Sequence, residues 1–245
     1  MNNRKQNYFE EYIINGKSYK LHIFDKISTP EEAYLIGYLL GDGGLNSEKN
    51  NPKNRLNRIY VSSINKEVIE GFQKCFCPDN EISSKIPINK KRNIKTNKLS
   101  YTLHFSSKFS KSFNNFGILN IKKDRNFANI PQKFMPDFLL GLFDSDGFIS
   151  WGRRKDRNRL WADIGIVHQS IKSLEKIQNF LSNKLNISSA LKQKGTENCY
   201  LLRFSNREKV FEFVNYIYSS NSSIYNKEKK ERAMQFIKEF NDLPN

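Results

Sequence analysis

Acidic residues are scarce in this chain relative to basic ones. Its 245 residues hold 25 Asp and Glu against 41 Lys and Arg, so the formal net charge is +16 at pH 7. An excess of this size predicts a polyanionic partner, either a nucleic acid or an anionic membrane surface. Hydrophobic residues make up 38% of the chain. We therefore expect a folded core rather than wholesale disorder.

Long apolar runs and a secretory signal are both missing. No segment of 18 apolar residues occurs, so no stretch is predicted to span a bilayer. The N-terminal stretch MNNRKQNYFEEYIING carries acidic residues and lacks the apolar region of a signal peptide. The chain has three cysteines, and the spacing of Cys75 and Cys77 does not suit a zinc knuckle. We expect reduced thiols and an intracellular protein.

One short pattern occurs twice. A helix is predicted to begin at Thr29, a good N-cap residue, with Pro30 in its first turn. This helix runs through YLIGYLLGDGG, and the segment FLLGLFDSDGF repeats the pattern at Phe138–Phe148. Asp42 and Asp146 are 104 residues apart. The repetition indicates an internal duplication.

The same order of elements follows each copy. Each Asp-Gly precedes a polar hairpin and an amphipathic helix, NKEVIEGFQKCF in the first copy and SIKSLEKIQNFLSNKL in the second. A second hairpin and another helix close each half, and KEKKERAMQFIKEF adds a further helix at the end. The order predicts an α+β protein with residues 1–29 as an extension, 30–125 as the first repeat and 126–245 as the second.

Helix capping alone does not explain the two aspartates. A glycine after each helix, Gly43 or Gly147, would cap it with a positive φ angle. A carboxylate at the negative end of a helix is disfavoured by about 0.3–1 kcal/mol, yet both copies keep one. Small residues four apart on each helix let two backbones approach closely, so the helices are predicted to pack through them. These interface residues are Gly37, Gly41, Gly141 and Ser145.

Close packing of the two helices would bring Asp42 and Asp146 together. Two adjacent carboxylates at two negative helix ends repel each other, and a hard divalent cation relieves the repulsion. Mg²⁺ binds one or two protein carboxylates and takes its other oxygens from water and phosphate. The pattern therefore predicts a site for Mg²⁺ (or Mn²⁺) that a phosphodiester completes.

The segments LIGYLLGDG, Leu35–Gly43, and LLGLFDSDG, Leu139–Gly147, resemble the motif that names the LAGLIDADG homing endonucleases. The resemblance covers nearly residues 30 to 240 and is to the single-chain form with two repeats. It implies two pseudo-symmetric αββαββα repeats, each with a four-stranded antiparallel saddle sheet, packed through the two motif helices. It also implies metal-assisted phosphodiester hydrolysis, with one DNA strand cut in each half-site.

The resemblance also implies roles for single residues. Asp42 and Asp146 match the position of the family's metal ligands, and the carbonyl groups of Gly41 and Ser145 would assist them. Further catalytic candidates are Gln169 with His168 beside it, Lys122 in LNIKK, and its counterpart Lys227 in YNKEKK.

The two half-sites differ in sequence. The sixth motif position is Leu40 in the first copy and Asp144 in the second. Where the second copy offers Gln169, the first offers only Ser62 or Ser63. These departures from the family pattern suggest asymmetry between the half-sites.

The predicted hairpins carry the basic residues that we expect to contact DNA. A strand rises about 3.3 Å per residue, so a hairpin of about eight to ten residues approaches one turn of B-DNA, and a two-stranded ribbon fits the major groove. About half of its side chains can face the DNA. We expect Arg58 and Arg159 to read bases and Lys91, Arg92 and Arg154 to touch phosphates. The full set is Arg55, Arg58, Lys85, Lys90, Lys91, Arg92 and Lys95, then Arg153, Arg154, Lys155, Arg157, Arg159, Lys192 and Lys194.

Two functions stay open on the sequence alone. One is a site-specific endonuclease for double-stranded DNA that acts as a monomer and is encoded in a mobile intron or intein-like element. The other is a nucleic-acid binder without cleavage, such as a group I intron maturase that binds intron RNA. Retention of Asp42 and Asp146 favours cleavage. A membrane surface is not expected, because the charge lies on predicted strands. The expected compartment is an organelle (mitochondrion or chloroplast) or the cytoplasm of a microbe or phage-infected cell.

Overall fold

The structure is a computed structural model that describes most of the chain. The described residues are 12–14, 16–19, 26–46, 58–89, 94–95, 98–106, 110–118, 122–154, 159–195 and 198–243. The described helices are all too short or too polar to cross a membrane.

Two repeats of the same element order make up the fold. The first comprises α1 (Pro30–Asp42), β3 (Gly43–Asn46), β4 (Arg58–Ser63), α2 (Lys66–Phe76), β5 (Ile82–Lys85), β8 (Ser100–His104) and α3 (Ser110–Asn115). The second comprises α4 (Met135–Asp146), β9 (Gly147–Arg154), β10 (Arg159–His168), α5 (Ile171–Leu185), β11 (Ala190–Gln193), β12 (Tyr200–Phe204) and α6 (Arg207–Tyr218). Their antiparallel sheets have the matching strand orders β3-β4-β8-β5 and β9-β10-β12-β11. The predicted αββαββα duplication is confirmed.

A few elements stand outside this scheme. They are the hairpin β1 (Tyr12–Ile14) and β2 (Lys17–Tyr19), the short pair β6 (Ile88–Asn89) and β7 (Ile94–Lys95), the 3₁₀ turns η2 (Lys122–Asp124) and η3 (Gln132–Phe134), and α7 (Lys227–Asn241). The β1–β2 hairpin is tied to the first repeat, where the backbone N–H of Ser18 donates to the Asp79 carboxylate at 2.8 Å. Tyr19 is buried there, and its hydroxyl donates to Asn80.

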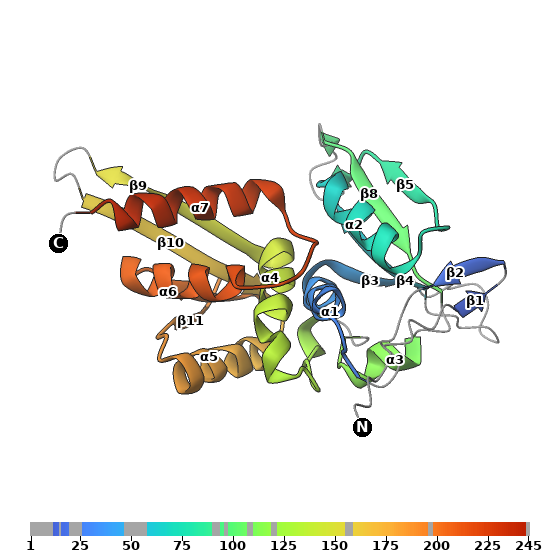
Figure 1. Ribbon diagram of the computed structural model, residues 1–245, viewed down its shortest axis with the longest axis horizontal. Helices are drawn as coiled ribbons and strands as arrows, with labels where there is room; N and C mark the ends of the chain where they lie inside the picture. Colours follow the sequence, from blue (N-terminus) through green and yellow to red (C-terminus); the bar gives the residue numbers. More distant parts are fainter. Residues whose placement is uncertain are drawn as a thin grey trace, which may run out of the picture.

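The helices α1 and α4 lie side by side between the two repeats (Figure 1). Thr29 and Glu32 form a capping box that starts α1. A Cβ atom at Gly37 would overlap the carbonyl oxygen of Phe138, and one at Gly141 would overlap that of Tyr34. Only glycine allows this approach, and the predicted packing of the two helices through small residues is confirmed.

The glycines that follow these helices are needed because a side chain would not fit, and not because the backbone is left-handed. Gly43 has φ −71° and Gly147 has φ −89°, both in extended backbone, so the expected positive φ is wrong. Each helix passes directly into a strand. A Cβ at either position would lie 2.4 Å from a carbonyl oxygen of the preceding turn, that of Leu39 or Phe143. The chain can turn this sharply only without a side chain.

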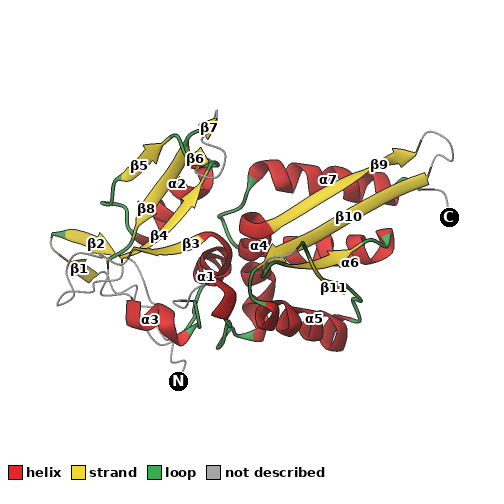
Figure 2. Cartoon of the chain, turned by 180° about the vertical axis from the view of Figure 1, so that it is seen from behind, coloured by secondary structure: helices red, strands yellow, loops and turns green. Residues whose placement is uncertain are grey.

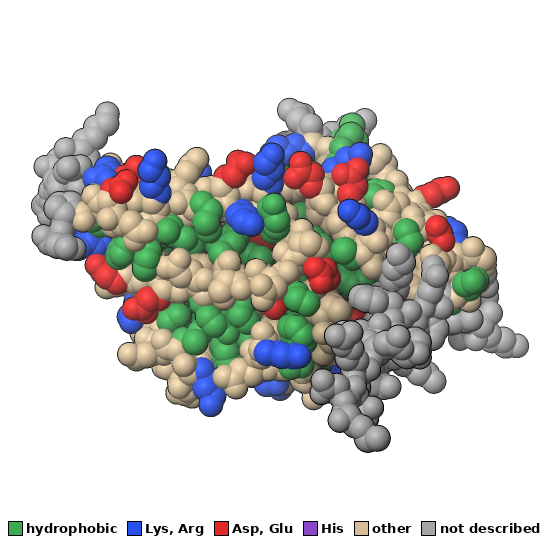
Figure 3. Space-filling model, in the orientation of Figure 1, with side chains coloured by type: hydrophobic (Ala, Val, Ile, Leu, Met, Phe, Trp, Pro, Cys, Tyr) green, Lys and Arg blue, Asp and Glu red, His purple; other side chains and the backbone are tan. Residues whose placement is uncertain are grey.

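Helices cover one face of each sheet, and none of the described helices covers the other. Seen from behind, β4 and β8 lie in front of α2, and β9 and β10 lie in front of α6 and α7 (Figure 2). Along β10 the side chains that point toward the helices are buried, and the residues between them are more exposed, except for Gly165. On the helical side, acidic and basic side chains are interspersed (Figure 3). We call the uncovered face of each sheet its open face.

Candidate metal centre and nucleic-acid interface

The two predicted metal ligands end two helices that touch. Asp42 is the last residue of α1 and Asp146 the last of α4. A Cβ at Gly41 would lie 3.0 Å from the carboxyl carbon of Asp146 and would overlap the Ser145 hydroxyl. The structure thus brings together Asp42, Asp146, Gly41 and Ser145, which the sequence singled out.

The carboxyl groups in this cluster influence one another. Burial raises the pKa of Asp146 to about 6; the charge of Lys122 lowers this pKa and the charge of Asp42 raises it further. The Lys122 Nζ lies 3.8 Å from Asp42 Oδ1, in the turn η2. A cation between the two carboxylates would offset both the cost of burying their negative charge and the repulsion between them.

A buried arginine caps the end of α1. The Arg125 guanidinium donates through Nη1 to the carbonyls of Leu39 at 2.8 Å and Leu40 at 2.7 Å, and through Nη2 to that of Gly43 at 2.8 Å. These carbonyl groups lie at the C-terminal end of the helix, where positive charge is favoured, and that of Leu39 also accepts from the Gly43 backbone N–H. Arg125 thus places a positive charge directly behind Asp42.

A lysine caps α4 in the same way. The Lys229 Nζ donates to the carbonyls of Phe143 at 2.7 Å and Asp144 at 2.9 Å, and it does not bind that of Ser145. Arg125 and Lys229 are 104 residues apart, as the two aspartates are. Burial lowers the pKa of Lys229, while Asp144 and other nearby carboxylates raise it. The duplication therefore includes a cation behind each metal-ligand candidate.

The second repeat also holds the end of α1. His168, the last residue of β10, is buried, and its Nε2 lies 3.0 Å from the Leu40 carbonyl oxygen. Its Nδ1 accepts from the backbone N–H of Ser170 at 3.0 Å, which assigns a neutral ring with the proton on Nε2. Burial lowers the pKa of His168, in agreement with a neutral ring. The hydroxyls of Ser170 and Ser173 donate to the carbonyl of Arg125. His168 is therefore part of the cap.

Asp144 makes the two helix ends unlike. Its Oδ2 accepts from the Tyr34 hydroxyl and from the backbone N–H of Asn226, both at 2.7 Å. Burial raises the pKa of Asp144 to about 6, although these hydrogen bonds oppose the shift. Leu40 holds the equivalent position in α1 and offers no such bonds. Asp144 links α4 to α1 and to the start of α7.

An open pocket of about 600 Å³ lies beside the carboxylates. Its lining includes Asp42, Lys122 and Lys229, together with Lys85 and Asn226. Lys122 reaches this space from the turn η2, and Lys229 reaches it from the first turn of α7. The pocket thus offers several cations next to Asp42, and Asp146 is not among the described residues that line it.

Two further catalytic candidates lie elsewhere. Lys227 is exposed at the first turn of α7 and is not among the residues that line the pocket, whereas Lys229 is, so the catalytic role of Lys227 stays a prediction. Residues two positions apart on an α-helix are rotated by about 200° about the helix axis, so Lys227 and Lys229 face different sides. Gln169 is exposed just beyond β10 and is not among the described residues that line the pocket.

The register identifies the counterpart of Gln169. Gly43 pairs with Val61 in the first sheet, and Gly147 pairs with Ile166 in the second. Ile64 is three residues after Val61, and Gln169 is three residues after Ile166, so the two positions correspond. The side chain of Ile64 is 58% exposed. The first repeat therefore carries an apolar residue there, and neither Ser62 nor Ser63 is the counterpart.

Some predicted DNA contacts have exposed side chains on the structure. Lys85, Lys192 and Lys194 are exposed in or beside β5 and β11. The predicted DNA contact of Arg153 is wrong on this structure. Its Nε donates to Glu239 of α7 at 2.7 Å, so Arg153 lies on the helix-covered face. Outside the described residues lie Arg55, Lys90, Lys91, Arg92, Lys155 and Arg157, as do the side chains of Arg58, Lys95 and Arg154.

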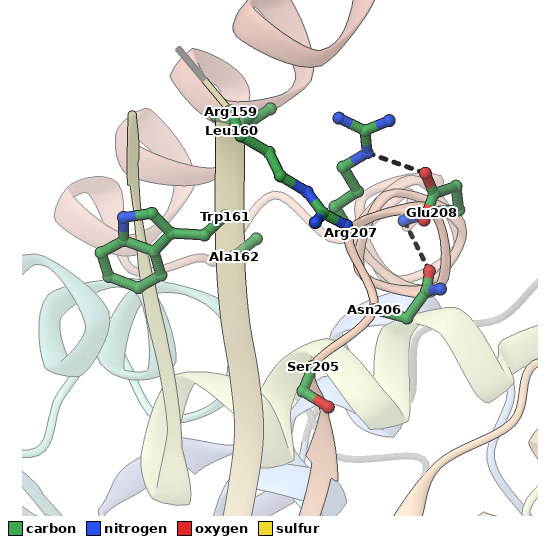
Figure 4. A pocket seen from close by; sticks show the side chains of 8 residues that line it. All are labelled: Arg159, Leu160, Trp161, Ala162, Ser205, Asn206, Arg207 and Glu208. Carbon is green, nitrogen blue, oxygen red and sulfur yellow. Dashed lines mark hydrogen bonds and ion pairs between the residues drawn. The ribbon is translucent and has the colours of Figure 1, made fainter. Parts of the chain in front are cut away.

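Arg159 is the first residue of β10 and pairs with Arg154 of β9. Its side chain extends toward the start of α6, where Arg207 donates to Glu208 at 2.8 Å (Figure 4). Trp161 projects to the opposite side of β10 from Ala162 and is 40% exposed (Figure 4). The role of Arg159 as a base reader stays a prediction.

The sequence reasoning missed Arg125, Lys229 and an ion pair on the open face of the second sheet. Arg203 on β12 donates to Asp163 on β10 through Nε at 2.7 Å and through Nη2 at 2.9 Å. The spacing of 104 residues could have revealed Arg125 and Lys229 as a pair.

Comparisons with known proteins match both repeats. A family model for the LAGLIDADG-like domain covers residues 29–116 and 134–218. The ATP-dependent DNA helicase Hel308 of Methanocaldococcus jannaschii is 28% identical over 178 residues, which make up 68% of this chain and 12% of that protein. The chain thus spans only a small part of this relative's length.

Solved structures with the same architecture include three nucleases bound to DNA. The homing endonuclease I-WcaI on its recognition sequence gives a TM-score of 0.57 at 18% identity, covering 85% of this chain and 87% of that one. Meganuclease I-SmaMI on uncleavable DNA gives 0.57 at 11% identity, covering 88% and 89%. LAGLIDADG meganuclease I-AabMI on uncleaved DNA gives 0.53 at 14% identity, covering 87% and 91%. At these identities the similarity shows the shared two-repeat fold.

Proposed function

Because the chain belongs to the LAGLIDADG-like domain family, we propose that it is a site-specific endonuclease that cuts both strands of a long, asymmetric DNA target. The observation that carries the proposal is the pairing of Asp42 and Asp146 at the ends of α1 and α4, where the two repeats meet. I-WcaI, I-SmaMI and I-AabMI share this architecture and were solved with DNA. Both repeats lie in one chain, so we propose that a monomer acts.

The residues present fit a hard divalent cation. No group of three or more His, Cys, Asp or Glu side chains that could hold a metal occurs among the described residues, so a site with many protein ligands is not formed there. Mg²⁺ suits two carboxylates with water and phosphate as further ligands. Asp42 and Asp146 would hold Mg²⁺ or Mn²⁺ with the carbonyls of Gly41 and Ser145. A metal bound there supplies Lewis-acid stabilisation of the reacting phosphate oxygens.

The protein groups around the carboxylates prepare the site for a phosphate. Asp146 must lose its proton to serve as a ligand, and the charge of Lys122 favours that loss. Lys122 and Lys229 line the same pocket, so their ammonium groups can stabilise the negative charge that develops on the phosphate. Arg125 and His168 fix the end of α1, which positions Asp42.

The open faces of the two sheets offer the DNA surface. A two-stranded ribbon fits the major groove, and the helices cover only the other face of each sheet. The excess of basic residues attracts the phosphate backbone and makes binding depend on salt. Each repeat would therefore contact one half of the target, with the carboxylates near its centre.

Selection from a randomised double-stranded DNA library tests the proposal without knowledge of the target. The protein is incubated with the library and Mg²⁺, and cleaved molecules are recovered and sequenced. We expect one long site to be enriched, and Asp42→Asn and Asp146→Asn to abolish the double-strand break. Arg153→Ala changes a residue on the helix-covered face, so it serves as a control and should cleave as the wild type does.

The rival function gives a different result in the same assay. A maturase or another non-cleaving binder would retain nucleic acid tightly but leave every DNA intact with both Mg²⁺ and Mn²⁺. That outcome would reject the endonuclease. Filter binding with duplex DNA and with folded intron RNA would then identify the preferred partner.

A further inference from the structure

The ion pair between Asp163 and Arg203 lies where DNA would bind. Arg203 on β12 is directly opposite Gly165 on β10, and Asp163 is two residues before Gly165, so all three positions share one face. Ile164 and Ile166, which alternate with them, are buried toward the helices. The side chains of Arg203 and Asp163 are 44% and 25% exposed. The pair thus stands on the open face of the second sheet.

The carboxylate uses only one edge of the guanidinium group. Arg203 donates Nε–H to Oδ1 at 2.7 Å and an Nη2–H to Oδ2 at 2.9 Å. The edge formed by Nη1 and the second Nη2–H remains, and within the described part of the chain no protein acceptor binds Nη1. Two parallel donors at this edge match the O6 and N7 acceptors that guanine presents in the major groove.

From this geometry we propose that Arg203, held in position by Asp163, reads one guanine in the half-site bound by the second repeat. The inference rests on the proposed function. Arginine loses much rotamer freedom when it is ordered, and a partner that orders it beforehand reduces that loss on binding. Asp163 is therefore a positioning residue and Arg203 the residue that determines specificity.

A purely structural role explains the pair less well. Ion pairs of this exposure contribute little to stability, because water screens them. Both residues also stand on the open face, which no helix among the described residues covers. A base reader, by contrast, needs an exposed arginine on this face.

The first sheet carries different side chains at the equivalent position. Tyr60 pairs with His104 there, as Gly165 pairs with Arg203 in the second sheet, and the two rings lie 5.7 Å apart. A guanine requirement is therefore expected in one half-site only. This difference matches the asymmetric target that a two-repeat chain can recognise.

The register also limits where the guanine lies. Gly165 pairs with Phe148, which is two residues after Asp146, and Arg203 is on the next strand. Neighbouring strands are about 4.8 Å apart, so Arg203 lies on the order of 10 Å from the line of β9. With about 3.4 Å per base pair, the guanine should lie within about five base pairs of the cut.

Specificity profiling of the wild type and three variants tests the inference. Every single-base variant of the selected target is assayed for binding and for cleavage. The wild type should prefer guanine at one inner position by about 5- to 150-fold, the range of a good bidentate contact. Arg203→Ala should lose the preference at that position and keep the rest of the profile, and Asp163→Asn should weaken it. Arg153→Ala removes an ion pair on the helix-covered face and should leave the profile unchanged.

Two results would overturn the inference. If Arg203→Ala weakens binding equally for all sequences, Arg203 contacts a phosphate. If it lowers the melting temperature while the profile stays that of the wild type, the ion pair is structural. Binding profiles still test the inference if the wild type binds without cutting, so failure of the endonuclease proposal is distinguished from failure of the base contact. A wild type that selects no DNA would overturn both.

Discussion

Replacement of Gly37 by alanine tests whether the contact between α1 and α4 positions the two aspartates. A Cβ at Gly37 would lie 1.9 Å from the carbonyl oxygen of Phe138, whereas real Cβ contacts essentially never fall below 3.0 Å. The helices must therefore move apart locally by at least about 1.1 Å, the difference of these distances. The obstacle is backbone of α4, so no change of side-chain rotamer removes it.

Both stability and cleavage should fall in Gly37→Ala. Overpacking of this kind costs about 1–3 kcal/mol, and we expect the upper end because backbone must move. Alanine returns about 0.5–1 kcal/mol as a better helix former. A net loss of about 2 kcal/mol lowers the melting temperature by about 4–8 °C in a chain of this size. A displacement of about 1 Å at the carboxylates can reduce the cleavage rate about 100-fold.

Gly71→Ala provides a matched control in helix α2. Its Cβ would meet the side chain of Ile224 at 3.1 Å, and that side chain can shift. We expect its stability to stay the same or to rise by up to about 1 kcal/mol, with wild-type cleavage. Thermal unfolding by circular dichroism and single-turnover cleavage of the selected target measure both effects. Wild-type melting and cleavage in Gly37→Ala would refute the reasoning.

Two further predictions concern the groups around the helix ends. Arg125→Met should lower the free energy of unfolding by about 3–5 kcal/mol in urea denaturation, because the end of α1 loses three hydrogen bonds to a buried cation; a loss under about 1 kcal/mol would contradict the cap. Burial raises the pKa of Asp144 to about 6, so its stabilising contribution is fully present below the unfolded value near 4 and is lost as pH rises through 6, by up to about 3 kcal/mol. Asp144→Asn should reduce this slope in metal-free urea denaturation between about pH 4 and 7.5 and leave the part that comes from Asp146, whose pKa burial also raises to about 6; equal slopes in the two proteins would contradict the prediction.

The duplication made most of the fold predictable from sequence. Hydrophobic periodicity and turn residues are local properties, and the chain states them twice, so each half supports the reading of the other. The contact through Gly37 and Gly141 was also predictable, since small residues four apart leave room for a second backbone. What the sequence did not reveal is the conformation of the glycines after the helices, because Gly43 and Gly147 accommodate a close carbonyl rather than a positive φ.

The surroundings of the carboxylates were harder to predict. Lys227 and Lys229 lie in one basic run, and only the phase of α7 against α4 decides which one reaches the pocket. Arg125 directly follows the short turn η2, and no local sequence pattern places its side chain at the end of α1. Arg153 illustrates another limit: Trp151, two residues earlier in β9, donates its indole N–H to the Arg232 carbonyl of α7 and so marks the covered face. That assignment requires knowing that α7 covers β9.

The differences between the repeats follow a common logic. Both repeats have a glycine directly after the motif helix, Gly43 or Gly147, and a cation that caps the helix. These features are repeated because both halves must hold a carboxylate at a helix end. Positions that only one half needs have diverged. Asp144 costs stability by being buried, and its hydrogen bonds to α1 and to the start of α7 explain its retention, since Lys229 lies in the first turn of α7. The first half holds Leu40 there and takes its cation from Arg125, which the second repeat anchors through two serine hydroxyls. The capping cation is thus held by Asp144 and the start of α7 in one half-site and by serines of the second repeat in the other. Two identical subunits could not provide this difference.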